Sequence, residues 1–202
     1  MIRDRVALIQ RWIERLYDLD AGPPVAEFIV SRRVAAALSV GVAARGEALL
    51  VADGGGAIDV ALFLDDWVLD GDERDLGVFA HAVEGVSHFV YVTFRGARGV
   101  AMTQLELELQ AEVDKYLACA EEVVRAPWSL EGLFERATFR DAPGTQERER
   151  YEVANREAAR FCRALEGERA RAGNVTSLLP ELRRFYRMGQ RQKMEHIRRR
   201  AA

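Results

Sequence analysis

The chain has 202 residues, a formal net charge of −3 and an apolar share of 49%. This composition excludes wholesale disorder and allows one substantial core, and the weak net charge argues against non-specific attraction to nucleic acid or membranes. The basic residues are 27 arginines and only two lysines, Lys115 and Lys193. We interpret this excess of arginine as the base composition of a GC-rich bacterial genome rather than as chemistry.

The cysteines and the N-terminal segment bear on the cellular compartment. Cys119 and Cys162 lie far apart within helix-like segments, so we expect buried free thiols rather than a disulfide framework. Residues 1–20 mix charges with apolar residues, unlike a signal peptide, and no apolar run approaches the roughly 20 residues that span a bilayer. We therefore expect a cytoplasmic protein with no membrane partner.

The first segment has apolar residues at helical spacing, which predicts an amphipathic helix over residues 2–17. A glycine and two prolines at residues 22–24 end it, because proline lacks an amide hydrogen. After them we predict a short strand at residues 28–31 and a helix or a turn over residues 33–39.

Two apolar runs rich in strand-forming residues, 47–52 and 58–64, are separated by three consecutive glycines. Glycine readily adopts the positive φ of hairpin turns, so the pattern predicts a β-hairpin. The alternative is a phosphate-binding glycine loop, but such a loop would be followed by a helix rather than by a second strand.

An acidic stretch over residues 65–75 precedes the next predicted helix. Its spacing does not match a calcium-binding EF-hand loop, and we interpret Asp72 as the N-cap of a helix over residues 73–87. The following residues, 88–94, are β-branched and aromatic, which predicts a strand.

The remainder of the chain has helical periodicity. Thr103 and Glu106 form a capping-box pattern before a helix over residues 103–124, which we expect Pro127 to end. Thr145 is the predicted cap of a further long helix.

Strands thus cluster in the first half of the chain and helices in the second. This order indicates an α+β fold with a small antiparallel sheet in the N-terminal half and a mostly helical C-terminal half. We divide the chain into an α+β domain over residues 1–126 and a helical extension over residues 127–202 packed on it, with one single domain as the alternative.

One candidate site lies in the sequence AHAVEGVSHF of residues 80–89. At about 100° per residue, His81, Glu84 and His88 share one face of the predicted helix. Two imidazoles and a carboxylate are ligands that zinc or iron accepts. The alternative is an exposed polar face on which Glu84 and His88 form an ordinary pair four residues apart.

A second set of carboxylates lies on the predicted helix over residues 103–124. Glu112 falls inside its apolar stripe, and Glu108 lies one turn earlier at its margin. A carboxylate in a core must be paired, protonated or bound to a metal. Lys115 or an arginine from residues 156–163 could supply a structural ion pair. In the alternative, both glutamates meet the histidines across a helix interface, as in the metal sites of helical bundles.

The last segment is strongly basic, with aromatic residues among its arginines, and Gly189 divides it into two short helices. Aromatic rings can stack on bases while arginines hold phosphates, so this tail could bind nucleic acid. The alternative leaves the arginines in solvent or against an acidic partner and places in the core Leu182, Phe185, Met194 and Ile197. The candidate contact residues are Arg183, Arg184, Phe185, Tyr186, Arg187, Arg191, Lys193 and Arg198.

Each of these patterns has a satisfactory structural explanation. The sequence therefore favours a non-catalytic component that acts by interaction or regulation, with another protein as its partner. One alternative is a nucleic-acid-binding module that uses the tail. The other is a metal-dependent enzyme with a zinc or iron site between helices, made by His81, Glu84, His88, Glu108 and Glu112.

Overall fold

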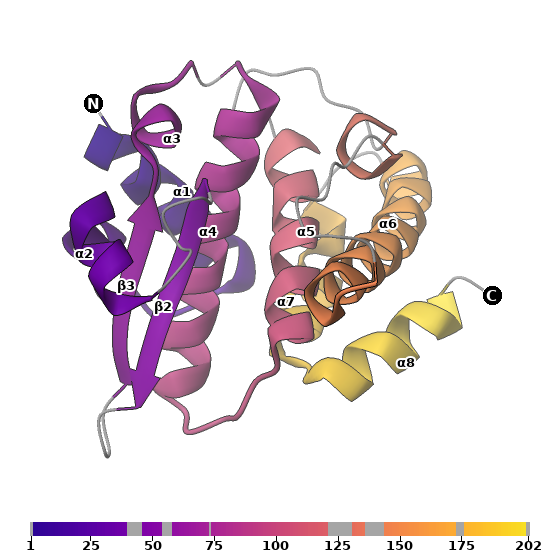
Figure 1. The fold of residues 1–202 in the computed structure, drawn as a ribbon. Helices are drawn as coiled ribbons and strands as arrows, with labels where there is room; N and C mark the ends of the chain where they lie inside the picture. The colour runs from indigo at the N-terminus through magenta and orange to yellow at the C-terminus, as the bar shows by residue number, and fades with distance from the viewer. Residues whose placement is uncertain are drawn as a thin grey trace.

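The structure of the chain is a computed structural model. It describes residues 2–39, 46–53, 58–72, 74–120, 131–135, 144–172 and 176–200. Strands occupy the N-terminal half and helices the C-terminal half, which confirms the predicted α+β fold. Figure 1 shows the successive layers, with the sheet on one side of the helix α4 (Leu76–Gly96) and the helices α5 (Gln104–Ala120) and α6 (Gln146–Ala172) on its other side.

The sheet contains the predicted hairpin and one further strand. β2 (Glu47–Asp53) and β3 (Ile58–Leu64) pair antiparallel, as the two apolar runs predicted. The predicted glycine turn between them lies outside the described residues. β1 (Ile29–Val30) pairs parallel with β3, so the strand order is β1-β3-β2 and the sheet is mixed rather than wholly antiparallel.

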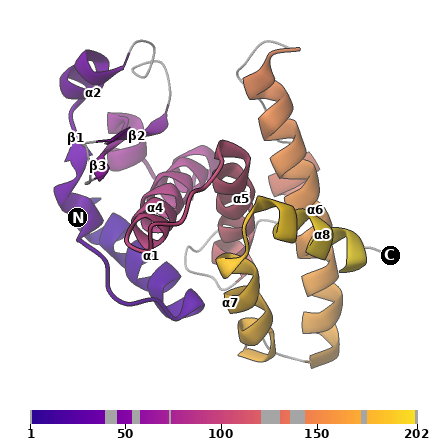
Figure 2. The same ribbon diagram turned by 90° about the horizontal axis from the view of Figure 1, so that it is seen from below.

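Helices cover both faces of this sheet. Phe63 is buried on the face of α2 (Arg32–Leu38), together with Ala35 of that helix. Leu62 and Leu64 alternate with Phe63 along β3 and join the main core against α4. Figure 2 shows α2 and α4 on opposite sides of the strands.

The strand predicted at residues 88–94 is wrong, because α4 (Leu76–Gly96) continues as one helix through this segment. The helix is packed between the sheet, α1 (Ile2–Tyr17) and α5 (Gln104–Ala120). A helix covered on several sides carries apolar and β-branched residues nearly all round, and such a run cannot be told from a buried strand by its sequence pattern. Residues 88–94 are therefore helical because of their burial between neighbouring elements, in spite of their local strand propensity.

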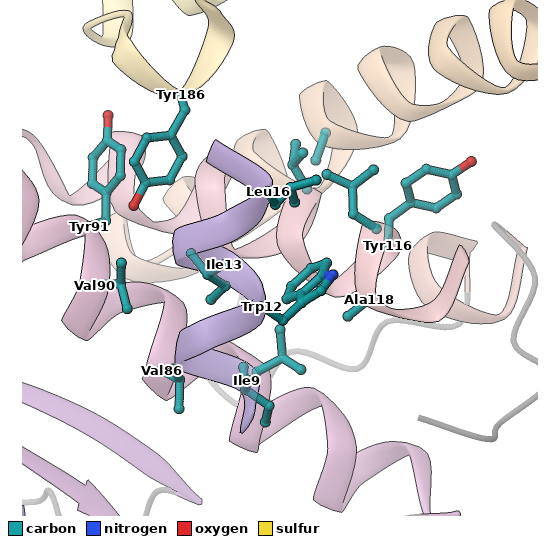
Figure 3. Close-up of a cluster of buried hydrophobic side chains, with 14 of the residues drawn as sticks. Ile9, Trp12, Ile13, Leu16, Val86, Val90, Tyr91, Tyr116, Ala118 and Tyr186 are labelled. Atoms are coloured by element: carbon teal, nitrogen blue, oxygen red, sulfur yellow. The ribbon is translucent and has the colours of Figure 1, made fainter. Parts of the chain in front are cut away.

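The main core lies where α1 crosses α4 and faces α7. Ile9, Ile13 and Leu16 project from α1 at helical spacing, as predicted, and are almost fully buried. Figure 3 shows Ile9 and Ile13 on the side of α1 toward Val86 and Val90 of α4, and Leu16 farther along α1 on the side of Tyr116. Each completely buried leucine or isoleucine stabilises the fold by about 1.5–3 kcal/mol relative to an exposed position.

Beyond α5, the described residues of the C-terminal half add five helical elements to this core. α6 packs along α5 and under α8, while α7 packs on α1. One hydrophobic cluster contains buried residues of both halves of the chain. The proposed boundary between residues 126 and 127, and Pro127 itself, lie outside the described residues. The elements are a π-helical turn (Glu131–Glu135), α6 (Gln146–Ala172), a 3₁₀ turn (Thr176–Leu178), α7 (Leu179–Arg187) and α8 (Gln190–Arg200).

An aspartate caps α4, as the sequence predicted, but it lies three residues later in the chain than the predicted one. Asp75, not Asp72, caps α4 by accepting hydrogen bonds from the amides of Gly77 (2.7 Å) and Val78 (3.1 Å). The acidic stretch before it contains the short helix α3 (Asp66–Asp70). Among the described residues, no helix has both the length and the apolar character needed to cross a membrane.

Candidate functional site

The structure brings three of the predicted metal ligands together. Glu84 and His88 project from α4 toward Glu108 on α5, and one ligand atom of each lies within 4.8 Å of the other two. All three side chains are largely buried, with exposed fractions of 13%, 8% and 10%. Glu84 and His88, which the alternative prediction placed on an exposed polar face of the helix, are therefore enclosed by neighbouring elements.

His88 lies between two carboxylates. Its Nε2 is 3.5 Å from Oε2 of Glu108, and its Nδ1 is 3.7 Å from Oε2 of Glu47, the first residue of β2. Both contacts are ion pairs, and neither His88 Nε2 nor Glu47 Oε2 makes a hydrogen bond to any residue that the structure describes, although both atoms are buried. Two ligands of a tetrahedral zinc ion stand about 3.4 Å apart when each is about 2.1 Å from the metal. The separation of His88 and Glu108 is close to that value.

Gly85 allows the strand and α4 to approach closely enough for this arrangement. A β-carbon at this position would lie 2.9 Å from Cδ2 of Leu64 and 3.6 Å from Oε2 of Glu47. Glycine is a weak helix former, and its presence in the middle of α4 is explained by this contact. The residue therefore helps to place the Glu47 carboxylate beside His88.

Lys115 supplies the positive charge on the other side of the cluster. Its Nζ donates to Oε1 of Glu112 at 2.7 Å and lies 3.3 Å from Oε2 of Glu84. The structural ion pair predicted for Glu112 is thus confirmed, and the partner is Lys115, the first of the two alternatives, rather than an arginine from residues 156–163. Arg150 on α6 is more distant, with its Nε 3.9 Å from Oε1 of Glu108.

Burial and mutual repulsion shift the protonation of this cluster. Burial raises the pKa of Glu47 and the pKa of Glu112 above the ordinary range. Burial acts against the charged form of Glu84 as well, but Lys115 and His88 outweigh it and lower its pKa.

The imidazole of His88 is shifted in the opposite sense to an ordinary buried histidine. Burial disfavours the imidazolium, but the carboxylates of Glu108 and Glu47 outweigh it and hold the pKa of His88 well above its usual value. Without a metal, the surroundings of His88 therefore favour the imidazolium over the neutral ring.

The two remaining predicted ligands lie outside this set. His81 packs edge-on against Trp67, with ring centroids 5.2 Å apart, in the part of α4 that faces α3. Glu112 is engaged by Lys115. Among the described residues, the group of ligand atoms that could hold a metal contains Glu84, His88 and Glu108 but neither His81 nor Glu112.

A second buried polar network, which the sequence did not indicate, joins α1, α4, α5 and α8. Asp114 is completely buried and accepts hydrogen bonds from the hydroxyls of Tyr17 and Ser87 and from the amide of Gln110. Burial raises the pKa of Asp114 to about 6, although these donors oppose the shift. Lys193 reaches the same network by donating to Oε1 of Gln110 at 2.5 Å.

The basic tail is only partly a surface. Phe185, Tyr186 and Lys193 are almost completely buried, so their predicted roles in stacking on bases and holding phosphates are wrong. The alternative prediction for the apolar residues is confirmed, because Leu182, Phe185 and Ile197 are in the core and Met194 packs against it. The rings lie inside because α7 and α8 must bury their apolar faces against α1 and α6.

Two of the candidate arginines of the tail contact the C-terminal end of α1. Arg183 donates to the carbonyl oxygen of Leu16, and Arg187 donates to those of Tyr17 and Asp18. These carbonyl groups are at the C-terminal end of α1, where the helix itself supplies no donor. The remaining candidates, Arg184, Arg191 and Arg198, are exposed.

Glu47 and Asp114 are the site residues that sequence reasoning missed. Glu47 is the first residue of a strand, and the residues around it in the sequence do not mark it as a site residue. Its partner, His88, is 41 positions away along the chain. Asp114 offered a weak signal, since it lies between the apolar residues Val113 and Tyr116.

Comparisons of the chain with models of protein families, with curated proteins and with solved structures gave no match in any of the three.

Proposed function

We propose that the protein binds one divalent metal ion, of the zinc or iron class, through Glu84, His88 and Glu108. The observation that carries this proposal is the imidazole of His88, whose buried Nε2 makes no hydrogen bond to any described residue and stands 3.5 Å from a carboxylate oxygen of Glu108. One imidazole and two carboxylates suit zinc and iron.

Glu47 has a different role in this proposal. Metal-bound histidines usually donate their second ring N–H to a carboxylate, which fixes the tautomer and the ring orientation. Glu47 Oε2 lies 3.7 Å from Nδ1 of His88 and is available for that contact. It is a positioning residue rather than a ligand.

The charges of the cluster support a dication. Four carboxylates, Glu47, Glu84, Glu108 and Glu112, face two cationic side chains, Lys115 and Arg150. With a neutral His88 this leaves two negative charges in a buried site, where an uncompensated charge is strongly unfavourable. A proton on His88 offsets one of them, and a divalent ion offsets both.

The metal would join the hairpin to the helical half of the molecule. Its ligands come from α4 and α5, and the orienting carboxylate comes from β2. The ligands are enclosed by side chains, which favours a structural or regulatory role over turnover of a substrate. We therefore favour a non-catalytic, cytoplasmic interaction or regulatory component whose partner-binding state depends on the metal. The two cysteines are buried free thiols, which is consistent with a reducing compartment.

The test is metal analysis of the full chain purified without a histidine tag. We expect close to one equivalent of zinc or iron, and a higher unfolding temperature when Zn²⁺, Fe²⁺ or Mn²⁺ is added to the chelator-treated protein. Metal content near zero with no thermal shift for any of these ions would overturn the proposal.

Substitutions distinguish the three ligands proposed from the structure from the five that the sequence predicted, which also included His81 and Glu112. His88→Gln and Glu108→Gln are expected to weaken metal binding by about a hundredfold or more, and Glu47→Gln by about tenfold or more. His81→Gln on the same helix is the matched control and should bind metal within about threefold of the unmodified chain. Equal losses in His81→Gln and His88→Gln would show that the ligand set is wrong.

A further inference from the structure

A hollow of about 400 Å³ lies between the last two helices, at a distance from the metal site. Figure 2 shows α7 and α8 meeting at an angle near the C-terminal end of the chain. The walls of the hollow come from both helices and from the residue that joins α7 to the turn after it. The lining residues are Arg184, Arg187, Met188, Gln192, Glu195 and Arg199.

The lining carries an excess of positive charge. Among the described residues, Arg184 and Arg199 form neither a hydrogen bond nor an ion pair. Arg187 donates only to backbone carbonyl oxygens, so its charge is not neutralised by a carboxylate. The one acid of the lining, Glu195, is paired with Arg191 at 2.9 Å. The hollow is thus lined by three guanidinium groups and one carboxylate, and that carboxylate interacts mainly with Arg191 and more weakly with Arg199.

We propose that this hollow binds a small phosphate ester. The planar guanidinium group matches a phosphate with two parallel hydrogen bonds, and it carries its charge at every physiological pH. Arg184 and Arg199 come from different helices, so they can contact one phosphate from two sides, while Arg187 adds a fixed positive charge. Gln192 and Met188 supply a polar and an apolar wall for the remainder of the molecule.

The observations favour a small compound over a nucleic-acid strand. A volume of about 400 Å³ falls in the range of roughly 300–1,000 Å³ that is typical of small-molecule sites. Binding of single strands relies on exposed aromatic rings on which successive bases stack. Phe185 and Tyr186, the aromatic residues of this segment, are buried and cannot serve as such platforms.

The experiment measures binding of ribose 5-phosphate, ribose, inorganic phosphate and a short single-stranded RNA to the full chain by calorimetry. We expect ribose 5-phosphate to bind and ribose not to bind, because the phosphate is the recognised group. Binding of inorganic phosphate as tight as that of the ester would support the same site and assign it to the phosphate group alone. Failure of ribose 5-phosphate to bind at millimolar concentration would overturn the proposal.

Two double variants, each of which loses two positive charges, test whether ribose 5-phosphate binds in this hollow. Arg184→Gln with Arg199→Gln should weaken binding of ribose 5-phosphate by about tenfold or more, because both guanidinium groups of the hollow are removed. Arg33→Gln with Arg198→Gln removes two exposed arginines outside the hollow and should leave the affinity within about twofold. Equal weakening in both variants would show non-specific attraction and overturn the proposal.

Binding of the RNA distinguishes a site for a small phosphate ester from a surface for nucleic acid. If the RNA binds more tightly than ribose 5-phosphate and Arg198→Gln weakens it as much as Arg184→Gln, the whole basic tail is a nucleic-acid surface and the proposal is wrong. Circular dichroism and unfolding temperatures of each variant confirm that the exposed substitutions leave the fold intact. The metal content of the variants should not change, which separates this site from the one between α4 and α5.

Discussion

His88 is a residue at which a proton and a metal ion compete for the same nitrogen. The carboxylates of Glu47 and Glu108 stabilise the imidazolium in the folded chain and hold its pKa well above the usual value of 6.5. A metal needs the neutral ring, so binding must release the proton. The same two carboxylates that attract the dication therefore make its affinity dependent on pH.

We predict that binding of Zn²⁺ at pH 7 releases about one proton, and that the affinity falls about tenfold for each pH unit below the raised pKa of His88. Calorimetric titrations in buffers with different ionisation enthalpies measure the released proton. His88→Gln removes the titrating ring and should abolish the buffer dependence. An enthalpy that is the same in every buffer for the unmodified chain would contradict this mechanism.

Lys193 is a second residue whose charge depends on its surroundings. Its amine donates to Gln110 and lies over the rings of Tyr91 and Phe185, at 4.7 and 4.8 Å from their centroids. Burial lowers its pKa from 10.5 to about 7, although the carboxylates of Glu106 and Asp114 oppose the shift. Below this pH the amine is charged in the folded state at the expense of stability.

A pH-dependent difference in stability follows for Lys193→Met. Because the folded pKa lies below the unfolded value, the contribution of Lys193 is complete above pH 10.5 and is lost as the pH falls toward 7. We expect the unmodified chain to gain up to about 3 kcal/mol relative to the variant between pH 7 and pH 9. Urea unfolding of both chains across this range measures it, and taking their difference removes the opposing contribution of His88. A constant difference would show that Lys193 does not titrate in this window.

At the scale of elements, the end of α1 depends on α7. The last carbonyl groups of α1 have no donors within the helix, and Asp18, which follows it, adopts a left-handed conformation with φ of 53°. Arg183 and Arg187 fill this gap from α7, and the guanidinium of Arg187 also lies 5.9 Å from the ring of Phe94 on α4. Two arginines of the basic tail thus connect three helices.

Arg187→Ala is expected to lower the free energy of unfolding by about 1–3 kcal/mol, because it leaves the carbonyl groups of Tyr17 and Asp18 without these donors. The matched control is Arg184→Ala, one turn earlier on α7, which is exposed and should change the stability by no more than about 0.5 kcal/mol. Chemical denaturation of both variants measures the effect. Equal stabilities of the two variants would show that the capping contacts contribute nothing.

At the scale of the whole molecule, the C-terminal helices complete the core of the N-terminal half. Tyr186 of α7 stacks on Tyr17 of α1 with ring centroids 4.0 Å apart, and it meets the edge of Tyr91 on α4. Lys193 of α8 reaches the network around Asp114. The tail is therefore part of the buried structure and not only an appended basic segment.

Deletion of residues 179–202 is expected to abolish the cooperative unfolding transition. It exposes the core on α1 and α4, and it removes Lys193, which donates a hydrogen bond to Oε1 of Gln110. Differential scanning calorimetry of the shortened chain measures this. The control keeps the full length and replaces the exposed Arg184, Arg191, Arg198 and Arg199 by glutamine, which should preserve the transition because exposed charges contribute little. A sharp transition in the shortened chain, within a few degrees of the original, would contradict the prediction.

The sequence by itself determined the elements whose pattern is local. The stripe of α1, the two strands of the hairpin, the position of Thr145 as a cap and the break at Gly189 all follow from residues close together in the chain. The same holds for the pair of Glu112 and Lys115, which are three residues apart on one helix. Helical and strand periods express which side of an element is apolar, and this information is present in every short window of sequence.

Only the tertiary structure decided which faces meet. Residues 88–94 are helical because neighbouring elements bury α4 on several sides, and no local window contains that fact. Glu108 was predicted to meet a histidine, but the choice of His88 over His81 and the presence of Glu47 depend on how α5 and β2 pack against α4. Contacts between residues far apart in the chain arise from the packing of whole elements, so the pairings in the buried site could be read only from the folded molecule.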